Sequence, residues 1–173
     1  VTSGPGSFTG LRISAGTVKA MAFGLDIPIV EIPTLDAIAA NVMYTDNFIC
    51  PIMDARRDRV YTSMYKWGEG GIEKLYDDMI LTISELEDLI QKNDKKTILL
   101  GDGVNVYKDQ LNENVKDKIY ISPLSIRLQK ASTVAILAKE KALKGDTISH
   151  IEYSPTYLRP SQAEREYNKN HKE

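Results

Sequence analysis

The chain has 173 residues, of which 42% are hydrophobic and 27% charged, and its formal net charge at pH 7 is −2. This composition is typical of a globular protein with one domain or two small lobes, and it excludes a chain whose whole surface grips nucleic acid, because such chains are strongly basic. Since no apolar run approaches the ~18 residues of a membrane span and no signal peptide is visible, we expect a cytoplasmic protein.

The chain begins at Val1, directly before the glycine-rich stretch SGPGSFTG at residues 3–10. A strand that should lead into this turn is missing or nearly so, so we expect the chain to be the back part of a longer protein. A helix is predicted at 9–24, with Ser7 or Thr9 as its N-cap, because apolar residues recur at three- and four-residue steps along one face. These residues are Leu11, Ala15, Val18, Ala22 and Leu25.

After this helix, short apolar runs alternate with amphipathic ones, which predicts an α/β fold. Strands are expected at 27–32, 47–55, 59–67, 75–82 and 95–103, with a hairpin turn at 55–58. Helices are expected at 34–43, 83–93, 104–115 and 133–145, the first, second and fourth capped by Thr34, Ser84 and Ser132. Residues 157–159 suggest a last strand, and the polar tail 159–173 is expected to fray.

The glycine-rich turn resembles a phosphate-binding loop but matches neither standard motif. A Walker A loop needs a lysine after its last glycine, and Leu11 stands there; the dinucleotide fingerprint is missed by one residue of spacing. Backbone N–H groups at a helix start still favour an anion, so an anion-binding turn remains one interpretation. The favoured alternative is a structural turn that needs glycine for positive φ or close approach of another segment. The residues concerned are Gly4, Gly6, Ser7 and Thr9.

No catalytic or metal-binding arrangement emerges from the sequence. Pro5 and Thr9 flank Ser7 where a nucleophile elbow needs glycines, and the two histidines, His150 and His171, lie in or near the tail. The single cysteine, Cys50, excludes an intrachain disulfide, fits a reducing compartment, and is interpreted as a small buried hydrophobe. We therefore predict no catalytic residues and no metal.

A dense charge group, DARRDR, covers Asp54 to Arg59 and includes Arg56 and Arg57. It is either a patch that binds a phosphate or an acidic partner, or a solvated hairpin turn, and the sequence alone favours the turn.

The helix at 9–24 is unusually rich in small residues. Glycine inside a helix costs about 1 kcal/mol relative to alanine, so such a helix suggests that another backbone approaches closely. One side could therefore pack on a partner helix while Ala15, Ala22 and Leu25 face the chain's own sheet, although both faces could also be internal. The predicted interface residues are Gly10, Leu11, Ser14, Thr17, Val18 and Met21.

Several segments resemble the TsaB (YeaZ) family, and the resemblance covers nearly the whole chain. They are SGPGSFTGLR with the helix that follows, MDARRDRVYTSMY, GDG at 101–103, and the closing YLRPSQAERE. The resemblance implies the two-lobe fold of actin, hexokinase and Hsp70 (ASKHA). Residues 1–32 would be the remainder of the N-terminal lobe and 33–158 the C-terminal lobe, with part of the first lobe lacking.

The resemblance also implies a role without chemistry of its own. Members of this family are thought to pair with the catalytic paralogue TsaD, with the ATPase TsaE completing the assembly. TsaD transfers a threonylcarbamoyl group to adenosine 37 of tRNAs that read ANN codons. A homodimer, tRNA contact through the complex, and ATP or ADP in the full complex stay open. Two alternatives are a glycopeptidase-like protease of the M22 type and an ATP-binding actin-like protein.

Overall fold

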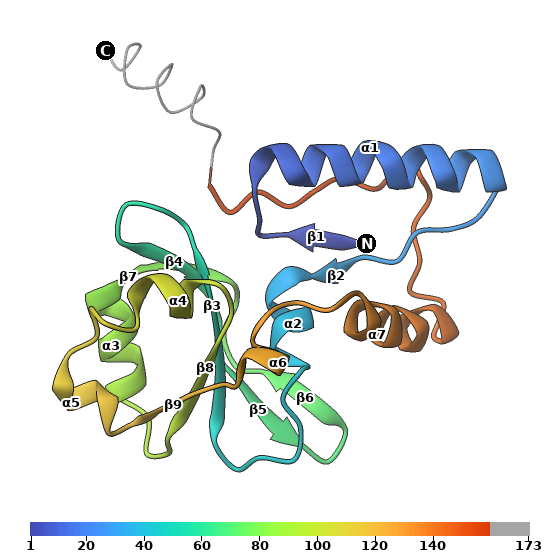
Figure 1. The fold of residues 1–173 in the computed structure, drawn as a ribbon. Coiled ribbons are helices and arrows are strands. Elements are labelled where there is room, and N and C mark those ends of the chain that lie inside the picture. Colours follow the sequence, from blue (N-terminus) through green and yellow to red (C-terminus); the bar gives the residue numbers. More distant parts are fainter. Residues whose placement is uncertain (160–173) are drawn as a thin grey trace, which may run out of the picture.

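The computed structural model describes residues 1–159 and has two parts, which lie side by side in Figure 1. One part is a two-stranded parallel sheet of β1 (Thr2–Gly4) and β2 (Ile32–Pro33), with α1 (Phe8–Leu25) lying along it. The other is a seven-stranded mixed sheet with helices around it. The expected α/β class is confirmed.

Helix α1 forms because its two ends are capped and one of its faces is buried. The Ser7 hydroxyl accepts a hydrogen bond from the Gly10 N–H at 3.4 Å, and Asp26 closes the helix with a left-handed φ of 51°. Ala15 and Ala22 on the inner face join a small core with Ile29 and Tyr153. The helix predicted at 9–24 is therefore present, with Ser7 as the N-cap.

The end of the chain returns to α1 and β1. Helix α7 (Ala131–Leu143) lies near β2, and Ile148 forms an isolated bridge with Ile29. Further on, the Thr156 N–H donates to the Ser3 carbonyl oxygen at 2.8 Å. Residues 131–156 thus pack with the first 32 residues, whereas the lobe boundary suggested by the family resemblance stays a prediction.

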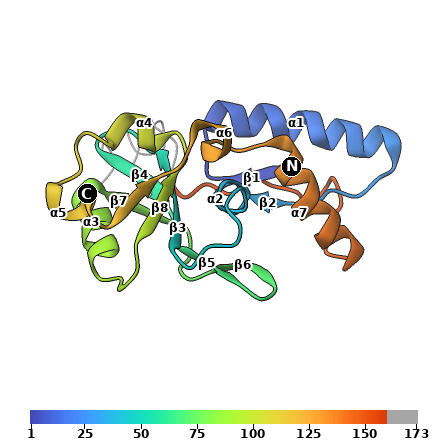
Figure 2. The same ribbon diagram turned by 60° about the horizontal axis from the view of Figure 1, so that its bottom comes forward.

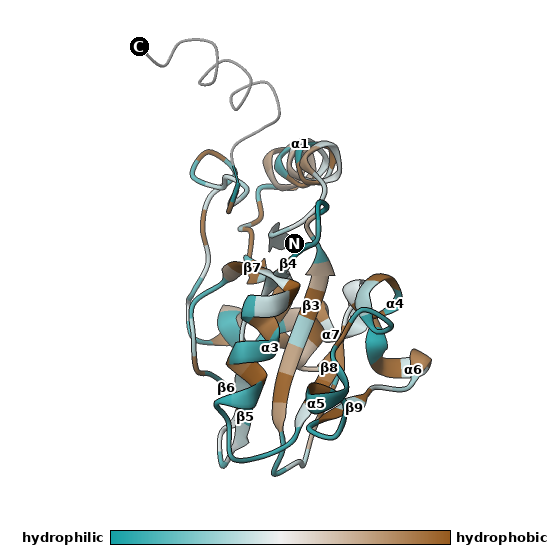
Figure 3. Cartoon of the chain, turned by 90° about the vertical axis from the view of Figure 1, so that its left-hand side faces the viewer, coloured by the Kyte–Doolittle hydropathy of each residue, from teal (hydrophilic) through white to brown (hydrophobic). Residues whose placement is uncertain are grey.

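The large sheet is organised around β3 (Phe48–Asp54), which Figure 3 shows as largely hydrophobic. β3 pairs in parallel with β8 along one edge and antiparallel with β4 and β5 along the other, so both of its edges are covered. The other strands are β4 (Arg59–Thr62), β5 (Tyr65–Gly68), β6 (Gly71–Lys74), β7 (Met79–Thr82), β8 (Thr97–Leu100) and β9 (Ile119–Ile121).

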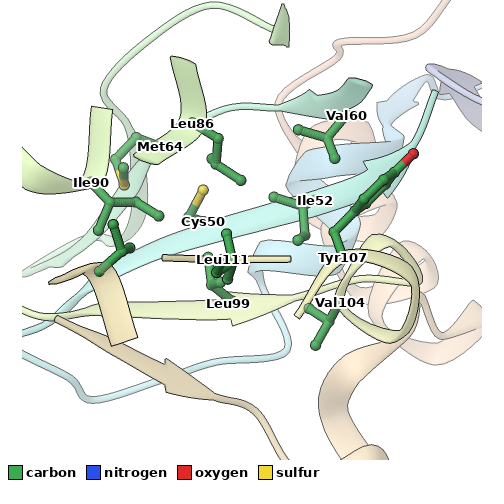
Figure 4. Close-up of a cluster of buried hydrophobic side chains, with 11 residues drawn as sticks. Cys50, Ile52, Val60, Met64, Leu86, Ile90, Leu99, Val104, Tyr107 and Leu111 are labelled. Atoms are coloured by element: carbon green, nitrogen blue, oxygen red, sulfur yellow. The ribbon is translucent and has the colours of Figure 1, made fainter. Parts of the chain in front are cut away.

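Helices cover the sheet and enclose two hydrophobic clusters. In the cluster drawn in Figure 4, Cys50 and Ile52 of β3 lie among residues of α3, β8 and α4, including Leu86, Leu99 and Tyr107. The second cluster packs α2 against β3 and β5. Figure 2 shows the helices spread along the length of the molecule. They are α2 (Thr34–Ala39), α3 (Ile83–Gln91), α4 (Gly103–Tyr107), α5 (Glu113–Lys116) and α6 (Leu124–Arg127).

Several predicted elements are wrong in extent. The single strand expected at 59–67 is interrupted: β4 ends at Thr62 and β5 begins at Tyr65, and both pair with β3 in the same antiparallel register. Of the strand expected at 75–82, only residues 79–82 form a strand, β7, and residues 71–74 before it form a further strand, β6. The run expected at 27–32 pairs with β1 only from Ile32 onward. The helix expected at 104–115 is divided into α4 and α5, and α2 ends at Ala39.

Three predicted N-caps and one predicted strand are also wrong. The N-cap of α2 is Pro33, not Thr34, and that of α7 is Lys130, not Ser132, each without a side-chain cap bond. α3 is capped by Thr82, not Ser84: the Thr82 hydroxyl and the Glu85 carboxylate form a reciprocal capping box. Residues 157–159 are not a strand, and residues 160–173 of the predicted tail lie outside the described residues.

Candidate functional site

The outer face of α1 is the first candidate surface. We define it by Ile13, Gly16, Thr17, Ala20 and Gly24, which are all exposed and lie opposite the buried Ala15 and Ala22. Ile13 exposes 65% of its surface, and a Cβ on either glycine would meet no atom within 4 Å. Nothing inside this chain therefore requires glycine at these two helical positions.

The predicted interface residues divide between two sides of α1. Gly10, Thr17 and Met21 are exposed, whereas Leu11 is buried and Val18 is half-buried against the inner core. Ser14 is half-buried and its hydroxyl donates to the Leu11 carbonyl oxygen at 3.0 Å. In this chain Leu11 and Val18 face inward, and the line of small exposed residues is rotated away from the predicted one.

In the glycine-rich turn, Gly4 is the position that most clearly requires a glycine. Gly4 has φ +125°, and a Cβ there would overlap the carbonyl oxygen of Thr156. The close approach of the returning chain thus explains this glycine. At the other predicted positions, Gly6 packs against Leu11, the Ser7 hydroxyl is held by the Gly10 N–H, and Thr9 is exposed. Anion binding at the turn stays a prediction.

A cleft of about 630 Å³ lies between this turn and the β3–β4 hairpin. All predicted turn residues except Gly4 line it. The cleft brings together segments that are far apart in the sequence: residues 5–9 with Leu11, residues 53–57 with Tyr61 and Asp102, and residues 156–159.

The β3–β4 hairpin that forms one wall has an uncommon backbone. Arg56, Arg57 and Asp58 all have left-handed φ values, of 60°, 58° and 54°. Non-glycine residues seldom adopt this conformation, and three in succession mark local strain. Asp54 holds the turn, because its Oδ1 accepts from the Arg56 N–H at 2.7 Å and from the Tyr107 hydroxyl at 2.7 Å.

Two carboxylates, those of Asp54 and Asp102, line the cleft. Burial raises the pKa of the Asp102 carboxyl, and the nearby Asp54 charge raises it further, while backbone N–H groups of Asp54 and Gly103 oppose the shift. Burial and the bond to Asp54 raise the pKa of Tyr107 to about 12. No sequence pattern marks Asp102 and Tyr107 as neighbours of Asp54, since only the fold places them side by side.

The structure does not assemble the nucleophile considered at Ser7. His150 contacts the ring of Phe23 at 5.2 Å, near the other end of α1, so it lies roughly 20 Å from Ser7 along the helix. Cys50 is buried, as expected, beside the Thr62 hydroxyl at 3.2 Å. Within residues 1–159, no three His, Cys, Asp or Glu side chains cluster as metal ligands, and no helix is both long and apolar enough to span a membrane.

Residues 1–167 match the family model described as TsaD, tRNA N6-adenosine threonylcarbamoyltransferase. The tRNA threonylcarbamoyladenosine biosynthesis protein TsaB of Bacillus subtilis is 32% identical over 167 residues, which cover 96% of this chain and 71% of that protein. The TsaB of Escherichia coli is 25% identical over 92% of this chain and 69% of its own length.

A solved structure shares the architecture. YeaZ from Pseudomonas aeruginosa superimposes with a TM-score of 0.73 and 24% identity, over 90% of this chain and 72% of that chain. With the family match, this likeness confirms the expected actin, hexokinase and Hsp70-like fold.

Proposed function

Because the chain belongs to the TsaD family and, within it, to the TsaB proteins, we propose that it is an accessory subunit in tRNA threonylcarbamoyladenosine biosynthesis. In this role it pairs with TsaD in the cytoplasm and activates it, without carrying out the transfer to adenosine 37 itself.

The observation that carries the proposal is the outer face of α1. Gly16 and Gly24 each cost about 1 kcal/mol relative to alanine, and no atom of this chain occupies the space beside them. Between these glycines, Ala20 also has a small side chain on the same face of the helix, and Ile13 adds an exposed apolar side chain. A second helix can approach such a surface closely and bury it.

TsaD is the partner that this surface favours. The model named for TsaD matches residues 1–167, so the two proteins share a fold and present related helices. Related chains pair most simply about a pseudo-twofold axis through equivalent surfaces, as identical chains do about a true one. The same reasoning allows this chain to form a homodimer when TsaD is absent. TsaE would join the assembled pair.

Peptide hydrolysis is the weaker alternative. One solved protein from Pseudomonas aeruginosa is described as similar to the peptidase YeaZ, and it matches this chain with 24% identity. In this chain the Ser7 hydroxyl is engaged in capping α1, and His150 contacts Phe23 far from it. No described histidine is therefore placed to act as a base for Ser7.

The test is reconstitution with TsaD from the same organism. We expect this chain to co-purify with TsaD and to raise threonylcarbamoyl transfer to tRNA, and Ile13→Glu to abolish both effects because it places a charge in the apolar contact. Ile136→Glu, which alters an exposed isoleucine of α7, is the matched control and should leave both unchanged. Failure of the unmodified chain to bind TsaD would overturn the proposed pairing.

A further inference from the structure

Two hairpin arginines and two aromatic rings line the cleft, and a third arginine, Arg12, stacks on one of these rings. Arg56 and Arg57 line the cleft from the hairpin, and Phe8 and Tyr157 line it from the opposite side. The two rings lie 5.0 Å apart between centroids, and the Arg12 guanidinium stacks on Phe8 at 4.6 Å. We call these five residues the arginine lip. Phe8 and Tyr157 expose 37% and 41% of their surface, so both can accept a further stacking partner.

The arginines of the lip form no ion pair within residues 1–159. Among residues 1–159, no carboxylate lies within 4.0 Å of the guanidinium group of Arg12, Arg56 or Arg57, whereas the ion pairs that do form all use lysines. Two of these arginines, Arg56 and Arg57, lie in the strained left-handed backbone of residues 56–58. Strain of this kind is kept where a site requires a fixed geometry.

The acidic wall of the cleft decides where an anion can sit. Asp54 and Asp102 line the same side as the hairpin, so a polyphosphate drawn fully into the cleft would be repelled by two carboxylates. Phosphates at the mouth would contact the arginines instead. A strand that carries one phosphate per nucleotide satisfies this arrangement, because its charges are spread along the lip rather than stacked in its interior.

From these contacts we infer that the arginine lip binds a single-stranded segment of the tRNA, an interaction that rests on the proposed function. Phosphates lie on Arg56, Arg57 and Arg12, and a base stacks on the rings of Phe8 and Tyr157. Aromatic rings beside arginines are the usual means of holding unpaired nucleotides without reading their sequence. A net charge of −2 for the whole chain is compatible with one such local patch.

The experiment measures tRNA binding by the complex of this chain with TsaD at salt concentrations from 50 to 200 mM. Arg56→Ala with Arg57→Ala should remove two phosphate contacts and lower the slope of log affinity against log salt by about 1.4. The affinity of the unmodified complex should therefore fall about sevenfold more than that of the variant over this range. Lys139→Ala with Lys144→Ala on the α7 side is the charge-matched control and should leave the slope unchanged.

A second measurement separates this inference from the proposed pairing. The chain alone is titrated with a fluorescent single-stranded RNA of the anticodon-loop sequence, with and without the two arginine substitutions, while TsaD pairing is measured by co-purification. Equal RNA affinity and equal salt slope for the variant and the unmodified chain would overturn the inference even if pairing is intact. RNA binding that ATP or pyrophosphate displaces at stoichiometric concentration would instead show that the lip serves a free nucleotide, which also overturns it.

Discussion

Replacing Gly16 by leucine should stabilise this chain and at the same time prevent its pairing with TsaD. Gly16 lies in the middle of α1, and a Cβ there meets no atom within 4 Å, so the new side chain creates no clash inside the chain. Leucine favours a helix over glycine by about 0.5–1 kcal/mol. For a chain of this size, that gain corresponds to a rise in Tm of about 1–4 °C.

The same leucine adds four carbon atoms to the surface where a partner helix would approach most closely. Thermal unfolding followed by circular dichroism measures the stability, and retention on immobilised TsaD measures the pairing. Ala135→Leu, on the exposed side of α7, is the control for added bulk and should change neither measurement appreciably. A lower Tm for Gly16→Leu would contradict the prediction, since the outer face would then be occupied within the chain. Retention of the variant as tight as that of the unmodified protein would contradict it equally.

The remaining predictions concern the turn, the core and the capping box. Gly4→Ala should lower the free energy of unfolding by roughly 2 kcal/mol or more in urea titrations, because φ is +125° there and the added Cβ overlaps the Thr156 carbonyl; a change within error would contradict this assignment. Burial raises the pKa of Cys50 to about 12, so iodoacetamide at pH 8 should label the thiol only as fast as the protein unfolds, and rapid labelling of native protein would show that the core is open. Hydrogen bonds from the Thr82 N–H and hydroxyl lower the pKa of the Glu85 carboxyl below 4.5. The stability that this carboxylate contributes is therefore present above pH 4.5 and is lost as the pH falls through the pKa of the folded state. Glu85→Gln should flatten this decline in the free energy of unfolding at acid pH, and an unchanged pH profile would count against the capping box.

The elements predicted best from the sequence are those whose residue pattern is compatible with only one type of secondary structure. Helix α1 was predicted within one residue at either end, because its apolar residues recur at helical spacing between a serine cap and a glycine-proline stop. The central strand β3 was found because a short, uninterrupted apolar run can be satisfied by a strand buried on both faces. Both signals are local and needed no knowledge of neighbouring segments.

Errors arose where a tertiary contact decides the outcome. Alternation continues unbroken from Arg59 to Trp67, yet the ladder is interrupted between Thr62 and Tyr65, where the Ser63 hydroxyl donates to the Tyr76 carbonyl oxygen. No local pattern reports that contact. The cap of α3 is different, because Thr82 followed by Glu85 three residues later is a capping-box signature that the sequence does contain. That error was avoidable, whereas the division of the strand was not.

The outer face of α1 and the arginine lip differ in how much of each the sequence alone could predict. Small residues surround α1, so the sequence identifies an interface helix but not the side that faces outward. That side is fixed by Tyr153, which packs against Ala15 and Ala22 after more than 130 intervening residues. The arginine lip depends on the fold even more strongly, because its arginines appear in the sequence as an ordinary charged turn. Only the return of Tyr157 to Phe8 turns that charge into one side of a site with aromatic rings opposite. Substituting Tyr157 should therefore weaken RNA binding without altering the charge of the chain, a result that a purely electrostatic patch would not produce.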